Sequence, residues 1–312
     1  MNRNFWGEKM GKDKKLNGWS WDLFISEDEK LVATCNNRNG VYVYDLETGR
    51  QVFKAKTVSY VSYVAISPNR KYLTAKNTSG MIAFLSMETG EEICRNKMAE
   101  TEGYPMIFTD EKCLLDFDQK GRTMLLDIEN NFRILDDIKE NDTGYSPFAY
   151  LHYDRFSKNI YKIVDRGREY KTAVALVSAS DPNSISYKVI RQFSGPAPDC
   201  IKGISFCRDH IYYLDADKKH LVVTDKDFTE TTKMQLPFKK EEAYRALQKI
   251  WISPCEKYLF VYLGGNTSGL FELASMKLIR EFEYYTISDF KMIDEDRRYI
   301  ISTWDGSYLG DV

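Results

Sequence analysis

The sequence predicts an all-β protein in which one strand-rich unit recurs seven times along the chain. Three observations support this prediction. An apolar alternating run, a short charged turn and a second apolar run recur together, as in "ISPNRKYLTA" from Ile66. Turns rich in Gly and Asn follow at a fixed place in most units. Aromatic residues make up 14% of the chain, with 21 Tyr, a composition that suits strands.

The spacing of the repeats predicts the architecture. We take the residue that ends the first strand of each unit as an anchor, and the anchors are Ser26, Ser67, Thr109, Asp154, Cys207, Ser253 and Asp294. They are separated by 41, 42, 45, 53, 46 and 41 residues. A four-stranded propeller blade needs about 40–45 residues. The sequence therefore predicts a seven-bladed β-propeller as a single domain over residues 1–312, with an insertion at 178–186 explaining the widest spacing.

Each unit supplies the turns and strands of such a blade. The second strand ends in a tight polar turn, at 36–40, 76–80, 118–121, 215–219, 264–269 and 305–306. Third strands follow, as at 41–45 and 81–86, and a Thr-Gly pair then precedes outer strands at 50–56 and 91–97. The one run with helical character, 239–249, predicts a single short helix between the fifth and sixth units.

The two ends of the chain predict how the ring closes. The seventh unit stops at Val312, before a fourth strand, whereas residues 1–16 precede the first anchor where an outer strand belongs. We expect this N-terminal segment to supply the outer strand of the last blade. Closure of this kind removes two exposed sheet edges.

Composition limits the partners and the compartment. The 44 Lys and Arg balance 46 Asp and Glu, so no global basic field favours nucleic acid. No segment approaches the roughly 18 apolar residues of a membrane span. The six scattered cysteines predict free thiols and a cytoplasmic protein. We expect a monomer of bacterial origin.

Motifs for catalysis or cofactors are weak. Cys207 and His210 have the spacing of metal ligands, but no second pair accompanies them, so we expect them to flank a turn. The Asp pairs at 116–121 and 214–219 have calcium-like spacing, and a turn role is favoured there too. The sequence holds no phosphate-binding Gly-rich loop and no nucleophile motif. We expect no cofactor, no metal and no enzymatic activity.

Aromatic residues recur just before the anchors. They occupy the links that enter six of the seven units, at Trp19, Tyr60, Tyr104, Tyr145, Tyr244 and Tyr285. In a propeller these links share one face, at the rim of the central channel. Tyr and Trp dominate interface hot spots, so the pattern predicts a binding surface for a protein or peptide. Packing between blades is the alternative role.

With these units assembled, the chain resembles the WD-repeat type of β-propeller, most closely in "ISPNRKYLTA" and "NGVYVYDLETGRQ". The Trp-Asp dipeptide that names this family normally ends the third strand of a blade. At that position this chain has Tyr44-Asp45, Leu126-Asp127, Thr224-Asp225 and, in the second unit, Leu85-Ser86. The literal Trp-Asp pairs at 21–22 and 304–305 fall at other phases, and no Gly-His pair occurs. The resemblance thus implies a divergent member that lacks the hydrogen-bonded Asp-His-Ser-Trp set.

The leading functional prediction is a non-enzymatic interaction module that binds a protein or peptide through the channel-rim face. One alternative is a hydrolase or lactonase-like propeller with a divalent metal held in the channel by carboxylates and amides. Three or more carboxylates converging on one point would favour that alternative. A toxin-neutralising partner protein is the other alternative.

Overall fold

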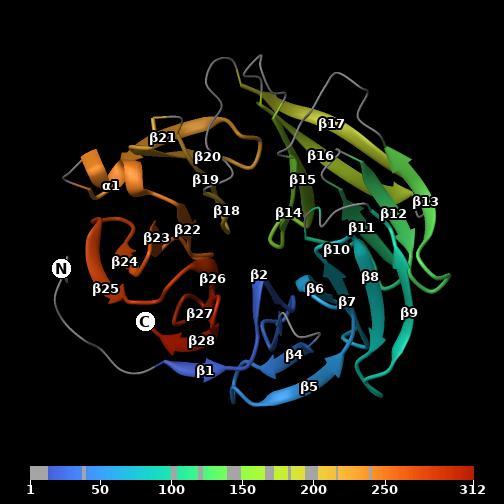
Figure 1. The fold of residues 1–312 in the computed structure, drawn as a ribbon. Coiled ribbons are helices and arrows are strands. Elements are labelled where there is room, and N and C mark those ends of the chain that lie inside the picture. The colour runs from blue at the N-terminus through green and yellow to red at the C-terminus, as the bar shows by residue number, and fades with distance from the viewer. Residues whose placement is uncertain are drawn as a thin grey trace. The chain divides into compact units, whose positions relative to one another are not determined.

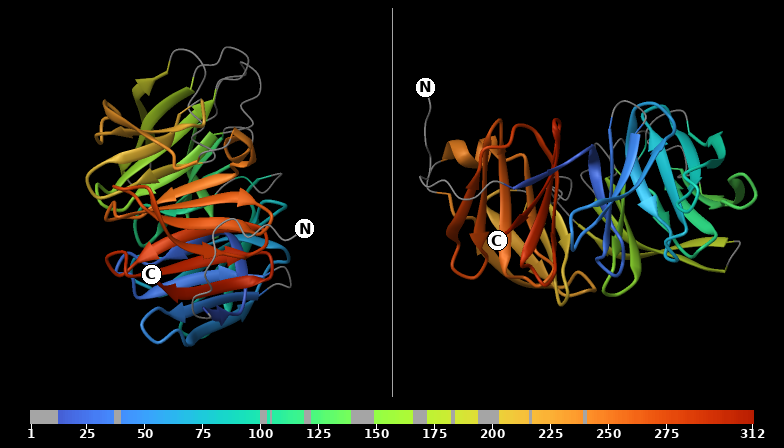
Figure 2. Two further views of the ribbon diagram at one scale, coloured as in Figure 1. Left: turned by 90° about the vertical axis from the view of Figure 1, so that its left-hand side faces the viewer. Right: turned by 90° about the horizontal axis from the view of Figure 1, so that it is seen from below.

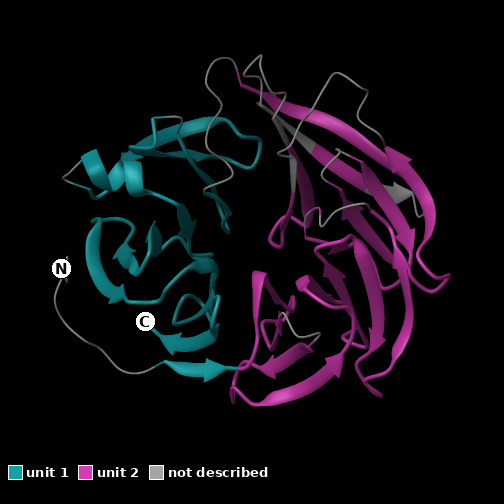
Figure 3. Cartoon of the chain, viewed as in Figure 1, with its two compact units in different colours: residues 1–16, 198–312 teal, residues 17–197 magenta. Residues whose placement is uncertain are grey.

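We analysed a computed structural model of the chain. The structure describes residues 13–36, 40–99, 103, 105–118, 122–138, 149–165, 172–181, 184–193, 203–215, 217–238 and 241–312. These residues form seven four-stranded antiparallel sheets and one short helix. The predicted seven-bladed β-propeller is confirmed (Figure 1). The chain divides into two compact units, unit 1 with residues 1–16 and 198–312 and unit 2 with residues 17–197 (Figure 3).

Unit 2 contains four sheets, and in each of them the strands pair in chain order. The strands are β2 (Trp19–Ile25), β3 (Leu31–Cys35), β4 (Gly40–Asp45) and β5 (Gln51–Lys56); β6 (Val61–Ile66), β7 (Tyr72–Asn77), β8 (Met81–Ser86) and β9 (Glu92–Lys97); β10 (Ile107–Phe108), β11 (Cys113–Phe117), β12 (Thr123–Asp127) and β13 (Arg133–Ile138); and β14 (Ala149–Asp154), β15 (Asn159–Asp165), β16 (Thr172–Asp181) and β17 (Ser184–Gln192). Most of the extra residues predicted at 178–186 lengthen a strand pair, because they belong to β16, with 10 residues, and β17, with 9 residues.

Unit 1 contains the other three sheets and the helix. Its elements are β18 (Ile204–Phe206), β19 (Ile211–Leu214), β20 (His220–Thr224) and β21 (Glu230–Gln235); α1 (Glu241–Ala246); β22 (Lys249–Ile252), β23 (Tyr258–Gly264), β24 (Thr267–Glu272) and β25 (Lys277–Phe282); and β26 (Ile287–Ile293), β27 (Arg298–Thr303), β28 (Gly306–Asp311) and β1 (Lys14–Leu16). The short helix predicted within 239–249 is confirmed as α1.

The N-terminal strand completes the last sheet, as the sequence predicts. Strand β1 pairs antiparallel with β28, with Lys15 opposite Tyr308. Figures 1 and 2 show this blue strand beside the red C-terminal strand. The edge that β28 would otherwise expose is thereby hydrogen-bonded.

Three of the seven anchor residues make the same local hydrogen bond. The hydroxyl oxygens of Ser26, Ser67 and Ser253 each accept a backbone N–H from the residue five positions later, at 2.9–3.0 Å. This bond fixes the turn between the first and second strands of the sheet. A short hydroxyl side chain is suited to such a local bond, so Ser recurs here.

Apolar side chains of the central strands form the core. In unit 2, Val43, Leu73 and Leu85 belong to one buried cluster, and all three are fully inaccessible to solvent. In unit 1, Phe260 and Phe290 stack with ring centroids 4.0 Å apart. Cysteines 35, 94, 113, 207 and 255 are thiols, as predicted, whereas Cys200 lies outside the described residues. No helix among the described residues is long and apolar enough to cross a membrane.

Candidate functional site

Two ends of each sheet must be distinguished. We call one end the rim end. There the first strand of the sheet begins, and the turn between the second and third strands lies beside it. We call the opposite end the turn end. It contains the anchor residue and the turn between the first and second strands. Trp19, Tyr60 and Tyr285 lie at the rim end of their sheets.

Two of the predicted aromatics are exposed at the rim end. Tyr60, in the link before β6, is 63% exposed, and Tyr285, in the link before β26, is 66% exposed. Tyr60 has a φ of 54° and its carbonyl accepts the Thr78 N–H at 3.2 Å. This bond ties the link to the turn between the second and third strands, so the backbone is held while the ring faces solvent.

Trp19 has a different environment, at the start of β2. It is half-buried, and its ring packs edge-on against Trp21, with centroids 5.7 Å apart. Between Trp19 and Phe24 the register with β3 shifts, so β2 bulges there. A bulge re-aims side chains, and Trp21 is 38% exposed.

Tyr244 belongs to the core instead. It lies on α1, is only 7% exposed, and donates its hydroxyl to the Phe238 carbonyl at 2.9 Å. Its ring packs edge-on against Phe238. For this residue the structure shows the packing role that the sequence left open. Tyr104 and Tyr145 lie outside the described residues.

The rim end also exposes an aromatic residue that the sequence analysis assigned to no site. Trp304, 53% exposed, lies in the turn between β27 and β28. The pairing of Ile287 with Thr303 places this turn beside the link that carries Tyr285. The Trp-Asp-Gly sequence of this turn was the available signal.

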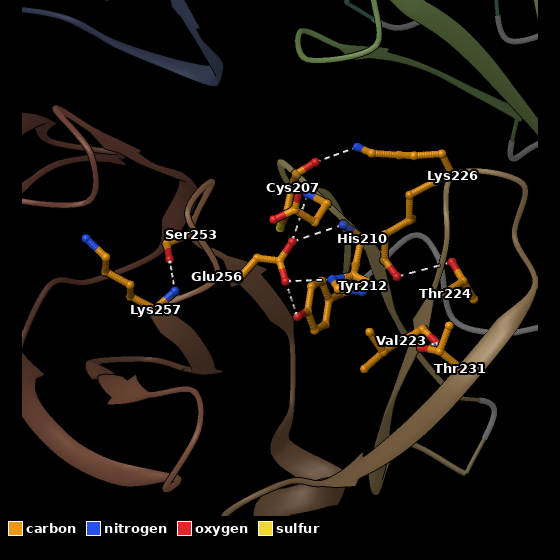
Figure 4. Close-up of polar contacts among 12 residues, drawn as sticks. Cys207, His210, Tyr212, Val223, Thr224, Lys226, Thr231, Ser253, Glu256 and Lys257 are labelled. Carbon is orange, nitrogen blue, oxygen red and sulfur yellow. Dashed lines mark hydrogen bonds and ion pairs between the residues drawn. The ribbon is translucent and has the colours of Figure 1, made fainter.

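Charged groups dominate the turn end. In unit 1, the Glu256 carboxylate accepts the backbone N–H groups of Asp209 and His210, both at 3.0 Å. It also pairs with His210 Nδ1 at 2.8 Å and accepts the Tyr212 hydroxyl at 2.7 Å (Figure 4). Glu256 thereby joins the turn before β23 to the turn before β19.

Hydrogen bonding controls the charge of Glu256. Burial raises the pKa of this carboxyl, but the bonds from His210, Tyr212 and the backbone outweigh burial, so the pKa lies below its ordinary value. Burial and the adjacent carboxylate raise the pKa of Tyr212, which stays a neutral donor. The Cys207 N–H donates to the His210 carbonyl at 3.0 Å, which confirms that these two residues flank a turn.

This geometry predicts a pH dependence of stability. Because the folded-state pKa of Glu256 is below the unfolded one, its contribution is present above the ordinary pKa of about 4.5 and is lost as pH falls through the folded pKa. We expect Glu256→Gln to lower the melting temperature by several degrees at pH 7 and by less at pH 3. Thermal unfolding followed by circular dichroism measures both values. An equal loss at both pH values would contradict the assigned role of the charge.

In unit 2, ionic contacts at the turn end connect two sheets that are not consecutive. Glu27, after β2, accepts the Tyr153 hydroxyl at 2.8 Å and pairs with Lys158 at 3.0 Å. Arg155 pairs with Glu29. These contacts link the first and fourth sheets, so the acidic turn 26–29 is neutralised within the chain.

The predicted turn role of the spaced Asp residues is confirmed for Asp118 and Asp217 and is wrong for Asp116. Asp217 accepts the Lys219 N–H at 2.7 Å, and Asp118 accepts the Arg122 N–H at 2.9 Å. Asp116 lies in β11 and pairs with Lys76 at 2.6 Å. Among the described residues, no group of three or more His, Cys, Asp or Glu side chains could hold a metal ion.

Comparison with known proteins identifies the fold. No family model and no curated protein matches the chain. Among solved structures, a chain of hydrazine synthase from Kuenenia stuttgartiensis is similar, with a TM-score of 0.67 and 12% identity, over 98% of this chain and 99% of that chain. At this identity the similarity concerns the fold alone, and it agrees with the seven-bladed β-propeller seen here.

Proposed function

We propose that the chain is a non-enzymatic interaction module, a divergent propeller of the WD-repeat type, that binds a protein or peptide at the rim ends of its sheets. One observation carries the proposal. The exposed large aromatic residues among those described are Trp21, Tyr60, Tyr285 and Trp304. Each lies at the rim end of its sheet, in a link, in a turn or close to the start of a first strand.

The chemistry of these residues suits recognition. Tyr and Trp offer a large, rigid contact area with a polar tip and lose little conformational entropy on binding. A purely structural aromatic would be covered, as Tyr244 is. Exposure of 63% and 66% at Tyr60 and Tyr285 leaves most of each ring available to a partner.

The turn ends support the same choice by contrast. Their charged side chains already pair within the chain, as Arg70 does with Asp28 at 2.9 Å and His210 with Glu256 at 2.8 Å. A partner at that end would have to break these contacts. At the rim end, Tyr60 and Tyr285 leave most of each ring exposed, so this end is the better site for docking.

The proposed partner is a cytoplasmic protein and the chain itself acts as a monomer. The thiols support this compartment, because structural disulfides form in oxidising environments. Tyr60 and Tyr285 are the exposed rim-end residues that we assign to this surface. Tyr104 and Tyr145 remain predicted members of the surface.

Photo-crosslinking tests the proposal. A photoreactive phenylalanine analogue placed at Tyr60 or Tyr285 is expected to capture a discrete partner in the producing cells. The matched control places it at Ile93, which is 51% exposed on the outer strand β9. Crosslinked products are resolved by electrophoresis and identified by mass spectrometry.

Substitution adds a quantitative criterion. We expect Tyr60→Ala and Tyr285→Ala to weaken binding of the captured partner by about 30-fold each, since hot-spot truncations typically cost about 2 kcal/mol. Their melting temperatures should stay within a few degrees of the parent protein. Equal capture from all three positions would contradict an interface at the rim end. Early melting of the Ala variants with unchanged affinity for the partner would contradict it too.

A further inference from the structure

We propose that Tyr285 and Glu283 together bind a cationic side chain, Arg or Lys, of the docking partner. The partner segment that meets this part of unit 1 is therefore basic. The inference rests on the proposed function, because it assigns the chemistry of one point on the rim-end surface. Three features of the seventh sheet and its entering link support it.

The first feature is the accessible aromatic surface. Tyr285 is 66% exposed and Trp304 is 53% exposed. Strand β26 begins at Ile287, which pairs with Thr303, so the link with Tyr285 and the turn with Trp304 emerge at the same end of one strand pair. Two ring systems thus border one area of surface.

The second feature is the exposed carboxylate of Glu283, in the same link as Tyr285. Glu283 precedes Tyr285 by two residues, is exposed, and forms no ion pair with the described residues. Burial, and then the negative charge of Glu283, raise the pKa of the nearby Glu281. The two carboxyl groups therefore repel each other, and a cation at this point would relieve the repulsion.

The third feature is that the same unit already holds two cations by this combination of groups. Lys15 Nζ lies 5.4 Å from the centre of the Tyr308 ring and 3.5 Å from Asp305. This exposed pair shows that a ring and a neighbouring carboxylate can hold an ammonium at the surface of the seventh sheet.

Arg280 is the second example, in a buried setting. Its guanidinium lies 4.8 Å from the centre of the Phe282 ring and 2.8 Å from the Asp13 carboxylate. Tyr285 and Glu283 present the same two kinds of group, but both face solvent. A cation from a partner can reach them without displacing a cation of this chain that the structure describes.

The area therefore has the charge and the ring faces that select a basic segment. Cations are attracted to the negative face of an aromatic ring, most strongly for Trp and Tyr. A guanidinium can stack on the ring and pair with the carboxylate at once, so Arg should be preferred over Lys. Neutral and acidic segments would gain neither contact.

Designed peptides test this inference. The probes are fluorescent peptides of equal length with a Gly-Ser spacer that carries Arg, Lys, citrulline or Glu at the same positions. Citrulline has the shape of Arg without its charge. Fluorescence anisotropy at low salt measures affinity for the parent protein and for Tyr285→Ala, Glu283→Gln and Tyr60→Ala.

We expect the Arg peptide to bind the parent protein about tenfold more tightly than the citrulline peptide, as one ring contact and one ion pair would provide. Tyr285→Ala and Glu283→Gln should each reduce this ratio to about threefold or less. Tyr60→Ala, which changes an exposed aromatic of unit 2, should leave the ratio unchanged. Unfolding curves confirm that all three surface variants remain folded.

Each contrary outcome has a defined meaning. The inference is overturned if the Arg peptide does not bind or if the Arg and citrulline peptides bind with equal affinity. It is also overturned if Glu283→Gln leaves the ratio of these two affinities unchanged. If Tyr285→Ala weakens every peptide equally and the ratio persists, the docking surface stands and its cationic preference is wrong. If crosslinking from Tyr60 and Tyr285 also captures no partner, the proposed function is wrong as well as the inference.

Discussion

Asp116→Ala is expected to destabilise the protein by about 3–5 kcal/mol, because it leaves a buried ammonium without its counter-ion. Lys76 Nζ lies 2.6 Å from Asp116 Oδ1 and donates to the Phe117 carbonyl at 3.2 Å. Both charged side chains are completely inaccessible to solvent. A loss of this size approaches the typical net stability of a domain, about 5–15 kcal/mol.

The surroundings of the pair leave little room for relaxation. Gly103 has a φ of 65°, and a Cβ atom there would lie 2.8 Å from Lys76 Nζ and 2.2 Å from the Phe117 carbonyl oxygen. Burial raises the pKa of Asp116, and the ammonium of Lys76 opposes that effect. Asp116 Oδ2 has no hydrogen-bond partner among the described residues. Loss of the carboxylate therefore removes the ion pair, while the Phe117 carbonyl still accepts from Lys76 Nζ.

Urea unfolding followed by circular dichroism measures the change. The matched control is Glu129→Ala, which breaks the exposed pair with Lys112 (3.1 Å) and should leave the urea midpoint nearly unchanged. The double variant Lys76→Met, Asp116→Leu removes both charges and should recover most of the loss. If Asp116→Ala costs no more than Glu129→Ala, the buried pair has no such role.

The architecture could be predicted because its signals are local. Ser26, Ser67 and Ser253 recur because each hydroxyl accepts a backbone N–H only five residues away. Turn Asp residues such as Asp217 accept a backbone N–H from the residue two positions later. A local constraint of this kind leaves the same residue type at the same position of three repeats, so it can be recognised in a single sequence.

The contacts that decide burial join residues that are far apart in the sequence, so the sequence alone could not reveal them. Lys76 and Asp116 are 40 residues apart, and Asp116 was interpreted as part of a turn although it lies in β11. Tyr60 and Tyr244 both precede an anchor, yet one is 63% exposed and the other 7% exposed. The difference arises from α1, which carries Tyr244 into the core beside Phe238.

Removing the Asp13 carboxylate is expected to cost about 3 kcal/mol, because it ends three hydrogen bonds that attach the N-terminal strand. Asp13 Oδ1 accepts from Arg280 at 2.8 Å and from the Tyr299 hydroxyl at 2.8 Å, and Oδ2 accepts from the Tyr284 hydroxyl at 2.6 Å. Its side chain is only 4% exposed, so water does not replace these bonds.

Strand β1 has only three residues, so it depends on this carboxylate for its position. Burial and the carboxylate raise the pKa values of Tyr284 and Tyr299, which therefore remain protonated donors at neutral pH. A Cβ atom on Gly310 would lie 2.4 Å from the Tyr299 hydroxyl and 2.6 Å from Asp13 Oδ1. Gly310→Ala should therefore disturb the same attachment without touching a charge.

Chemical unfolding of Asp13→Ala, of Gly310→Ala and of a chain lacking residues 1–16 measures the attachment. The truncated chain exposes the edge of β28 and should both melt earlier and self-associate, as unpaired strand edges do. Lys15→Ala is the control, since its surface pair with Asp305 at 3.5 Å should be worth less than about 1 kcal/mol. A truncated chain that stays monomeric with an unchanged melting temperature would show that β1 is dispensable. An effect of Asp13→Ala as small as that of Lys15→Ala would show instead that the backbone pairing of β1 with β28, and not the carboxylate, closes the last sheet.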